Sequence, residues 1–189
     1  MRKRSAEQGE LTEMKKALLI IDMQVMPFVW KNFGGKSLYQ EEKLLANTKR
    51  LIEKARKSNS PIFYIMFTER EGSLRSENQP LWRVHEQIAP VEHDHIIIKS
   101  HADSFLESGL HNQLKDLCID TLIMCGIQTE YCVDTTVKSG FSHGYQVELV
   151  KDCHSTYDTD ELTAEKIINH HNSILAQFAA IVLTNEVQF

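Results

Sequence analysis

Three side chains with complementary chemistry follow apolar runs in this sequence. Asp22 comes directly after the run ALLII, Lys99 ends the run HIIIK, and Cys132 follows the run TLIMCG after a short connection. A thiol is a nucleophile, a carboxylate accepts a proton, and an ammonium group holds a neighbouring anion in place. These groups are sufficient for covalent attack on a carbonyl carbon. We therefore take Asp22, Lys99 and Cys132 as the candidate catalytic residues.

Each of the three also has an ordinary structural interpretation. Asp22 could close a turn after its strand, Lys99 could be a solvated charge, and Cys132 could be a small buried apolar residue. Their shared position after strands favours the catalytic interpretation, because a catalytic group of residues needs mutual geometry. A cysteine at the start of a helix and close to a lysine would also be expected to form a thiolate more easily.

The elements that must position these residues follow from apolar periodicity. Six apolar runs predict strands and four stretches with an apolar stripe predict helices. We expect strands at 15–22, 61–67, 95–99, 121–126, 145–152 and 179–184, and helices at 41–58, 107–117, 130–144 and 160–178. This alternation predicts an α/β fold, a three-layer α/β/α sandwich with a mostly parallel, doubly wound, six-stranded sheet. Ligands of such sheets bind at the carboxyl ends of the strands.

The totals are those of one domain, which we place at residues 15–189. The chain has 189 residues, of which 42% are hydrophobic, and a formal net charge of −5. This charge gives no electrostatic reason to expect binding to nucleic acid or to an acidic membrane. Residues 1–14 are polar and lack the apolar segment of a secretory signal, so we expect a poorly ordered tail. Four cysteines without a CxxC pair indicate reduced thiols in a cytoplasmic protein.

Three motifs give the sequence a resemblance to a known family. IIDMQ around Asp22, IIIK ending at Lys99, and GIQTEYCVDTT around Cys132 resemble motifs of the isochorismatase-like cysteine hydrolases, which include nicotinamidases and related amidases. The similarity extends over residues 15–184, and the motif around the cysteine is the most specific. The resemblance implies that the three candidate residues form the catalytic triad of that family.

The resemblance also implies features of the backbone and of the assembly. The backbone N–H groups of Gln128 and Cys132 correspond to the oxyanion hole of the family, and the peptide bond between Ile127 and Gln128 corresponds to a cis bond. A homo-oligomer is implied as well, with loops of a neighbouring subunit closing the pocket.

The sequence departs from the metal-dependent members of that family. Nicotinamidases of the family carry a metal site with an Asp-x-His pair after the first helix-loop region and further histidines, whereas residues 25–75 of this sequence contain no histidine. His93 and His95 alternate along an extended segment, but no third ligand is evident and a polar start to a strand is favoured. We therefore expect no metal and no cofactor. Strict isochorismatases lack the nucleophilic cysteine, so Cys132 favours attack on a C–N bond over cleavage of a vinyl ether.

Aromatic side chains near the motifs are the candidates for substrate contact. Phe28 and Trp82 rank highest, Tyr131 is added because it precedes the nucleophile, and Trp30 could line the pocket from the side of Phe28. Core packing or a subunit contact is the alternative interpretation for all four. The other three cysteines are expected to be structural, with Cys118 and Cys125 packed in the core and Cys153 near a strand end.

The sequence thus predicts a metal-independent cysteine hydrolase that cleaves a C–N bond of a small amide-like substrate through an acyl-enzyme on Cys132. A carbamoyl group or a cyclic amide is the alternative substrate for the same triad. A non-catalytic binding or redox-responsive module, in which Cys132 is oxidised reversibly, is the rival from another class. A nucleotide-binding domain is disfavoured, because no GxGxxG or GxxxxGK[ST] motif follows a predicted strand.

Overall fold

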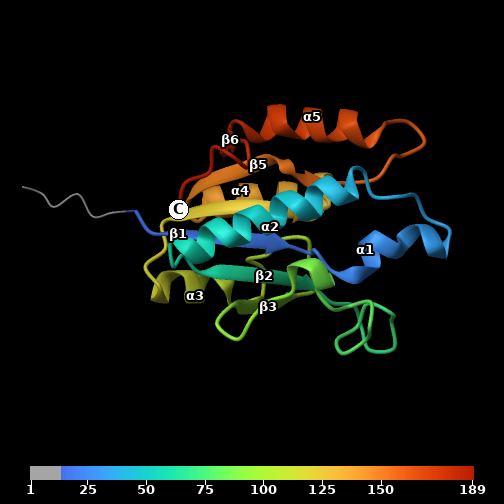
Figure 1. The fold of residues 1–189 in the computed structure, drawn as a ribbon, viewed down its shortest axis with the longest axis horizontal. Helices are drawn as coiled ribbons and strands as arrows, with labels where there is room; N and C mark the ends of the chain where they lie inside the picture. The colour runs from blue at the N-terminus through green and yellow to red at the C-terminus, as the bar shows by residue number, and fades with distance from the viewer. Residues whose placement is uncertain (1–13) are drawn as a thin grey trace, which may run out of the picture.

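The protein is built around one parallel sheet with helices on both faces (Figure 1). The computed structural model describes residues 14–189, so the expectation of a poorly ordered tail at 1–14 lies, except for Met14, outside the described residues. The six strands are β1 (Lys16–Ile21), β2 (Ile62–Phe67), β3 (His95–Lys99), β4 (Thr121–Ile127), β5 (Gln146–Ser155) and β6 (Ala180–Val182). Their order is β3-β2-β1-β4-β5-β6, and each neighbouring pair is parallel. The predicted doubly wound α/β fold is confirmed.

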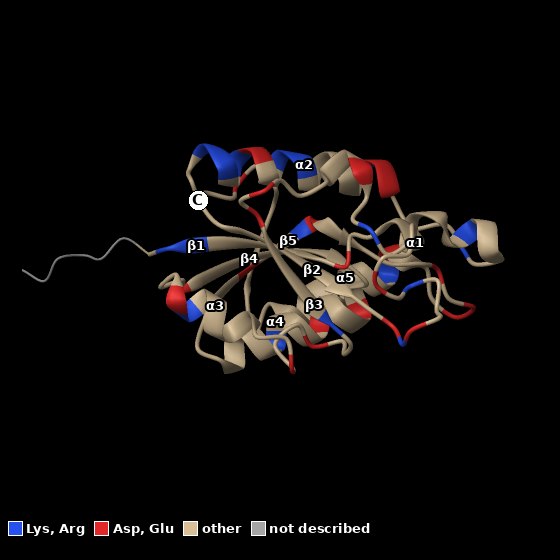
Figure 2. Cartoon of the chain, turned by 90° about the horizontal axis from the view of Figure 1, so that it is seen from below, with Lys and Arg blue, Asp and Glu red and all other residues tan. Residues whose placement is uncertain are grey.

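The helices form the two outer layers. The α-helices are α1 (Val25–Val29), α2 (Glu41–Lys57), α3 (Leu110–Asp116), α4 (Asp134–Ser142) and α5 (Ala164–Leu175). Three short helical segments complete the set: η1 (Trp30–Phe33), η2 (Glu86–Ile88) and the π-helical η3 (Thr129–Val133), which runs directly into α4. Figure 2 shows α2 on one side of the sheet and α3 and α4 on the other. The sequence did not predict α1 and η1, because their short helical turns carry no extended apolar stripe.

The central strands are buried on both faces because their apolar residues alternate between two cores. Along β1, Leu18 and Ile20 pack in the core under α2, whereas Ala17, Leu19 and Ile21 pack in the core under α3 and α4. All five are at most 1% exposed. This explains the continuous apolar run in the sequence, since a strand covered on both faces has no polar side.

Close pairing of β1 and β4 brings the ends of these two strands together. Ile21 pairs with Gly126, and a Cβ added to Gly126 would lie 2.1 Å from the Ile21 carbonyl oxygen. Gly126 also has a φ of +129°, which side-chain-bearing residues rarely adopt. A glycine is therefore required at the end of β4, directly beside the residue that precedes Asp22.

No helix within residues 14–189 is long and apolar enough to cross a membrane. The cytoplasmic location and the homo-oligomer stay predictions.

Candidate active site

Asp22 is held at the carboxyl end of central strand β1 by its backbone and by Gln24. Its φ of 52° lies in the left-handed region, which turns the chain sharply away from the sheet. The backbone N–H of Asp22 donates to the Ile65 carbonyl at 2.9 Å. The buried side chain of Gln24 bonds both backbone groups of Phe67, at 3.0 Å each, and donates to the Trp82 carbonyl at 2.6 Å. Gln24 thus ties the turn after β1 to the end of β2.

Lys99 reaches Asp22 from the edge of the sheet. It ends β3, and β2 lies between β3 and β1. Its Nζ lies 2.9 Å from Asp22 Oδ2, and the side chain is fully buried. The ammonium group also donates to the carbonyls of His101 and Ala102, at 3.1 and 3.2 Å. An ammonium group has three donors, so Lys99 is saturated by these three acceptors and serves as a fixed positive charge beside the carboxylate.

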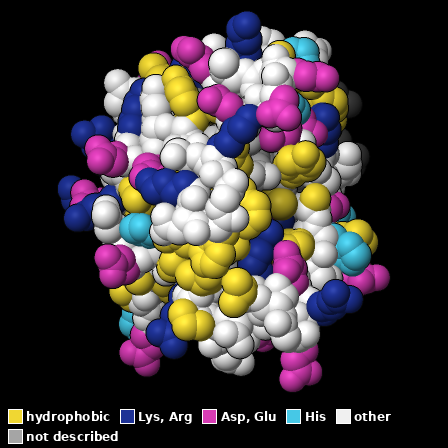
Figure 3. Space-filling model, turned by 90° about the vertical axis from the view of Figure 1, so that its right-hand side faces the viewer, with side chains coloured by type: hydrophobic (Ala, Val, Ile, Leu, Met, Phe, Trp, Pro, Cys, Tyr) yellow, Lys and Arg dark blue, Asp and Glu magenta, His cyan; other side chains and the backbone are white. Residues whose placement is uncertain are grey.

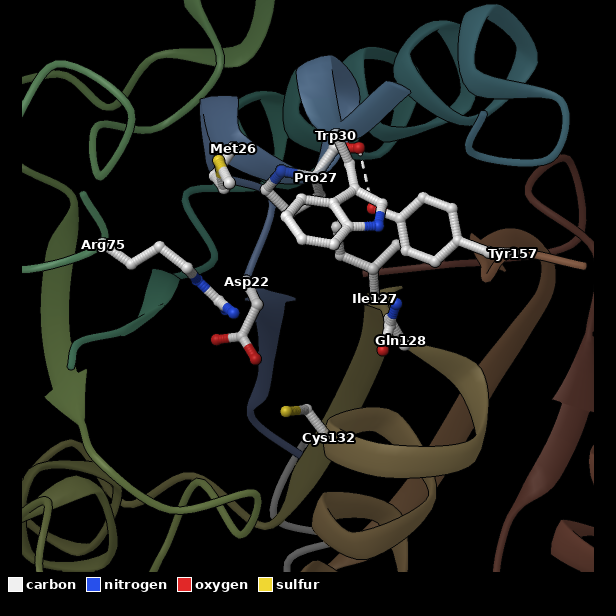
Figure 4. A pocket seen from close by; sticks show the side chains of 9 residues that line it. All are labelled: Asp22, Met26, Pro27, Trp30, Arg75, Ile127, Gln128, Cys132 and Tyr157. Atoms are coloured by element: carbon white, nitrogen blue, oxygen red, sulfur yellow. Dashed lines mark hydrogen bonds between the residues drawn. The ribbon is translucent and has the colours of Figure 1, made fainter. Parts of the chain in front are cut away.

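Cys132 lies in the first turns of the continuous helix formed by η3 and α4. The preceding peptide bond between Ile127 and Gln128 is cis, as the resemblance implied. In Figure 4 the sulfur of Cys132 points toward the carboxylate of Asp22, across the floor of a shared cavity. Oδ1 of Asp22 is buried and has no hydrogen-bond partner among residues 14–189. The oxygen that does not contact Lys99 is therefore free to accept a proton.

The three groups share one positive and one negative charge. Burial raises the pKa of Asp22, and the Lys99 ammonium and the Cys132 thiol partly offset this effect. Burial and the negative charge of Asp22 raise the pKa of Cys132 to about 12, and the Lys99 charge acts in the opposite direction. A second negative charge in this buried site is unfavourable. These effects favour a neutral thiol at Cys132, in contrast to the more easily formed thiolate that the sequence led us to expect.

A small cavity opens beside the catalytic group. Its volume is about 260 Å³, and besides Asp22 and Cys132 its wall consists of Met26, Pro27, Trp30, Arg75, Ile127, Gln128 and Tyr157. Figure 3 shows the face onto which the carboxyl ends of the strands open, with apolar side chains gathered near its centre and charged ones around them. The hydroxyl of Tyr157 donates to the Pro27 carbonyl at 2.7 Å, so the tyrosine offers the cavity its ring (Figure 4).

The three aromatic residues predicted to contact substrate lie elsewhere. Phe28 is 7% exposed and packs in the core, with its ring 4.7 Å from that of His85. Tyr131 is 59% exposed and is not part of the cavity wall. Trp82 is partly buried and does not line the cavity either, although its carbonyl accepts the bond from Gln24. None of the three lines the cavity, whereas Trp30 does, and contact of the three with substrate stays a prediction.

Comparison with known proteins assigns the chain to a family. The family model described as the isochorismatase domain matches residues 16–186. The chain belongs to the isochorismatase family. The resemblance read from the three motifs is thereby confirmed across nearly the whole sequence, and the protein is a hydrolase of this family.

Two relatives and one solved structure illustrate the range of similarity. The isochorismatase family protein YddQ of Bacillus subtilis (strain 168), described as uncharacterized, is 30% identical over 76% of this chain and 79% of its own. A streptothricin hydrolase of Streptomyces noursei is 28% identical over 76% of this chain and 50% of its own length, so the match spans half of that relative. The crystal structure of an isochorismatase family protein has a TM-score of 0.81 at 30% identity, with coverage of 88% and 97%.

Within this family framework, the loops supply the parts of the site that the sequence did not indicate. Met26, Pro27 and Trp30 share one face of the unpredicted α1 and η1 segment. Gly35 packs against Trp30, since an added Cβ would lie 1.9 Å from the indole nitrogen. Arg75 comes from the loop after β2, and Tyr157 follows β5, which continues three residues beyond its predicted end. The only sequence signal at Arg75 was the polar composition of its loop. The neighbouring residues share this composition, so it did not single out Arg75.

No group of three or more His, Cys, Asp or Glu side chains suited to a metal ion occurs within the described part of the chain. The ring of His95 stacks on Phe63 with centroids 4.4 Å apart, so it serves packing. The absence of a metal and of a cofactor from the reaction stays a prediction, as do the backbone oxyanion contacts at Gln128 and Cys132.

Proposed function

We propose that the protein hydrolyses a C–N bond of a small amide through a covalent thioester on Cys132. The observation that carries this proposal is the buried pair of Asp22 and Lys99 at 2.9 Å, with the second carboxylate oxygen unpartnered in the cavity that Cys132 also lines. A buried carboxylate with one oxygen fixed and the other free is suited to accept and return a proton. The thiol beside it is the group whose proton it would take.

In the first half of the reaction, the sulfur of Cys132 attacks the carbonyl carbon while Asp22 accepts the thiol proton. The new S–C bond displaces the carbonyl π electrons onto oxygen. When this tetrahedral intermediate collapses, the C–N bond breaks and Asp22 passes its proton to the departing nitrogen. A thioester on Cys132 and a free amine, or ammonia, result.

In the second half, Asp22 takes a proton from a water molecule whose oxygen attacks the thioester. The C–S bond breaks, the carboxylic acid leaves, and the proton returns to sulfur. Lys99 keeps its proton throughout, because its ammonium group is engaged by three acceptors. It stabilises the ionised state of Asp22 that both halves of the reaction require.

The raised thiol pKa is compatible with this mechanism. A thiol with a pKa of about 12 is a poor nucleophile at neutral pH unless its proton is removed as it attacks. Asp22 provides that removal at the moment when charge moves from sulfur to the substrate oxygen. The site therefore reacts by general-base assistance rather than through a stored thiolate.

The name of the relative streptothricin hydrolase describes hydrolysis by a protein that shares 28% identity with this chain over part of its length. It supports hydrolysis on this scaffold. The carbamoyl and cyclic amide alternatives remain substrates of the same triad, and the size of the cavity favours small members of either class.

Detection of the covalent intermediate tests the proposal. Wild-type protein mixed with a panel of small amides and quenched in acid should gain the mass of the acyl group on the peptide that contains Cys132. Cys132→Ala should show neither this adduct nor release of amine, whereas the matched variant Cys118→Ala, at an exposed thiol, should show both. An adduct on another residue would contradict the mechanism. Peroxide-dependent sulfenate on Cys132 without any acylation would favour the redox-responsive module instead.

A further inference from the structure

Arg75 brings a positive charge to the wall of the catalytic cavity, and its one ion-pair partner within residues 14–189 is the exposed Glu69. Among the described residues, Asp22 is the only acidic side chain of that wall, and Lys99 pairs with it at 2.9 Å. The remaining wall is apolar or aromatic, apart from Gln128 and Cys132. A guanidinium group in the wall of such a cavity favours a ligand with an anionic group.

The guanidinium group of Arg75 retains free hydrogen-bonding capacity. Its one ion-pair contact within residues 14–189 joins Nη1 to Glu69 Oε1 at 3.3 Å, and both side chains are more than a third exposed. Solvent screens such a pair, so Glu69 competes weakly with an incoming anion. Of the five N–H donors of a guanidinium group, most are left for a carboxylate, which Arg binds through two parallel bonds.

The surrounding loop holds Arg75 in a defined position. The Glu69 N–H donates to the Arg75 carbonyl at 3.1 Å, and the Arg75 N–H donates to the hydroxyl of Ser73 at 3.1 Å. The guanidinium carbon lies 4.8 Å from the centre of the Phe67 ring at the end of β2. Figure 4 shows the resulting direction, with the guanidinium group extending toward Asp22. Because the Arg75 side chain is already oriented, it loses less conformational entropy when a ligand binds.

The volume of the cavity that Arg75 and Cys132 share limits the size of the ligand. Arg75 and Cys132 line the same cavity of about 260 Å³, so one small molecule can contact both. In Figure 4 the carboxylate of Asp22 lies between Arg75 and Cys132, and the rings of Trp30 and Tyr157 lie above them.

We propose that the physiological substrate is a small amide that carries a carboxylate, with the carboxylate bound by Arg75 and the amide carbonyl placed at Cys132. Arg75 is thus a specificity-determining residue. This inference rests on the proposed function, because it names the substrate class of the same site.

Binding is tested separately from turnover by using the Cys132→Ala protein, which retains the cavity but lacks the nucleophile. The probes are two matched pairs: succinamate against succinamide, and 4-carbamoylbenzoate against terephthalamide. In each pair a carboxamide replaces the carboxylate at nearly constant size. Isothermal titration calorimetry should show at least one anionic probe binding about 10- to 100-fold more tightly than its neutral partner. Added salt should reduce the difference, because Arg75 is partly exposed.

Arg75→Gln in the same background should weaken the preferred anionic probe by about 10- to 100-fold and its neutral partner by less than about 3-fold. Arg75→Lys should fall in between, since it keeps the charge but loses the two-pronged geometry. Arg70→Gln, at an exposed arginine of the same loop, is the matched control and should change neither affinity.

Three results would overturn the inference. They are equal affinity for the two probes of both pairs, an equal loss of affinity for both probes of a pair in Arg75→Gln, and no binding of either anionic probe up to about 50 mM. The proposed function is judged independently, by acyl-enzyme formation in protein with Cys132 intact. Turnover of neutral and anionic amides at equal kcat/KM, with Arg75→Gln lowering kcat for both, would keep the amidase and reject the carboxylate site. Arg75 would then act on Asp22 rather than on the substrate.

Discussion

Cys132 and Cys125 both have raised thiol pKa values, yet their surroundings give them different chemistry. Burial raises the pKa of Cys132 to about 12, and the pKa of Cys125 lies well above its ordinary value because of its contact with Cys153 and its burial. Cys125 is fully buried on β4, where its thiol donates only to the Leu19 carbonyl at 3.7 Å. Cys132 instead faces a cavity and a carboxylate oxygen that has no hydrogen-bond partner in the part of the chain that the structure describes.

The comparison shows that the pKa of a thiol does not identify a nucleophile in this fold. A neutral thiol in an apolar core has no group to receive its proton, so it stays inert. The same neutral thiol beside a buried carboxylate can lose its proton during attack. Access to substrate and a nearby proton acceptor therefore separate the reactive cysteine from the structural one.

The largest expected effect separates these two thiols by turnover. Cys132→Ala should lower kcat for amide hydrolysis by about 10³-fold or more, because no covalent intermediate can form. Cys125→Ala should keep kcat within about 2-fold and reduce the free energy of unfolding by about 1 kcal/mol through the small cavity left in the core. Steady-state kinetics and urea unfolding measure the two effects. Comparable loss of kcat in both variants would mean that packing, and not chemistry, limits the reaction.

The next effect tests whether Asp22 acts as a base or stores a thiolate. Asp22→Asn should lower kcat by about 10²- to 10⁴-fold, because the proton acceptor is lost. It should also speed alkylation of Cys132 by iodoacetamide several-fold at pH 8, because the negative charge that raises the thiol pKa is removed.

Peptide mapping is needed for this measurement, since Cys118 is exposed and will react as well. In the wild-type protein, alkylation of Cys132 should keep rising from pH 5 to 9 without a plateau. Asp120→Asn, at the amino end of β4, is the matched control. If Asp22→Asn slowed alkylation together with turnover, Asp22 would be maintaining a thiolate and the general-base mechanism would fail.

The smallest effect concerns the pH dependence of kcat/KM. Activity requires ionised Asp22, so its acidic limb should lie above the ordinary range of an aspartate, because burial raises this pKa. Lys99 lowers the same pKa, so Lys99→Met should move the limb to still higher pH and reduce activity more at pH 6 than at pH 9. Lys138→Met removes an exposed partner of Asp134 and should leave the profile unchanged. An unmoved limb in Lys99→Met would exclude Asp22 as the titrating group.

The catalytic residues and the walls of the cavity differ in how far the sequence predicts them. The sequence predicts the catalytic group of Asp22, Lys99 and Cys132. Buried parallel strands are recognisable by their apolar runs, and the carboxyl ends of such strands meet at one edge of the sheet. The pairing of Asp22 with Lys99 across an intervening strand was expected only in outline, since strand order is not local information. The family motifs added the evidence that these three residues form one triad.

Phe28 and Trp30 show why the walls could not be assigned in the same way. They follow β1 in a short helical segment, where residues two apart point to opposite sides. Phe28 therefore enters the core and Trp30 reaches the cavity, a distinction that requires knowing that a helix begins at Val25. The prediction that Cys118 packs in the core was also wrong. It follows the last turn of α3 with a φ of 56° and is exposed.

The position of Lys99 links activity to the local stability of one strand. β3 is one of the two edge strands of the sheet and pairs only with β2, whereas Asp22 and Cys132 follow the central strands β1 and β4. Segments at an edge open at a lower free energy than a central core. An opening confined to β3 withdraws the ammonium group from Asp22 while the rest of the sheet stays paired. The local stability of edge strand β3 therefore sets how well the activity resists mild denaturant. Two relatives with equal global stability can differ in this resistance.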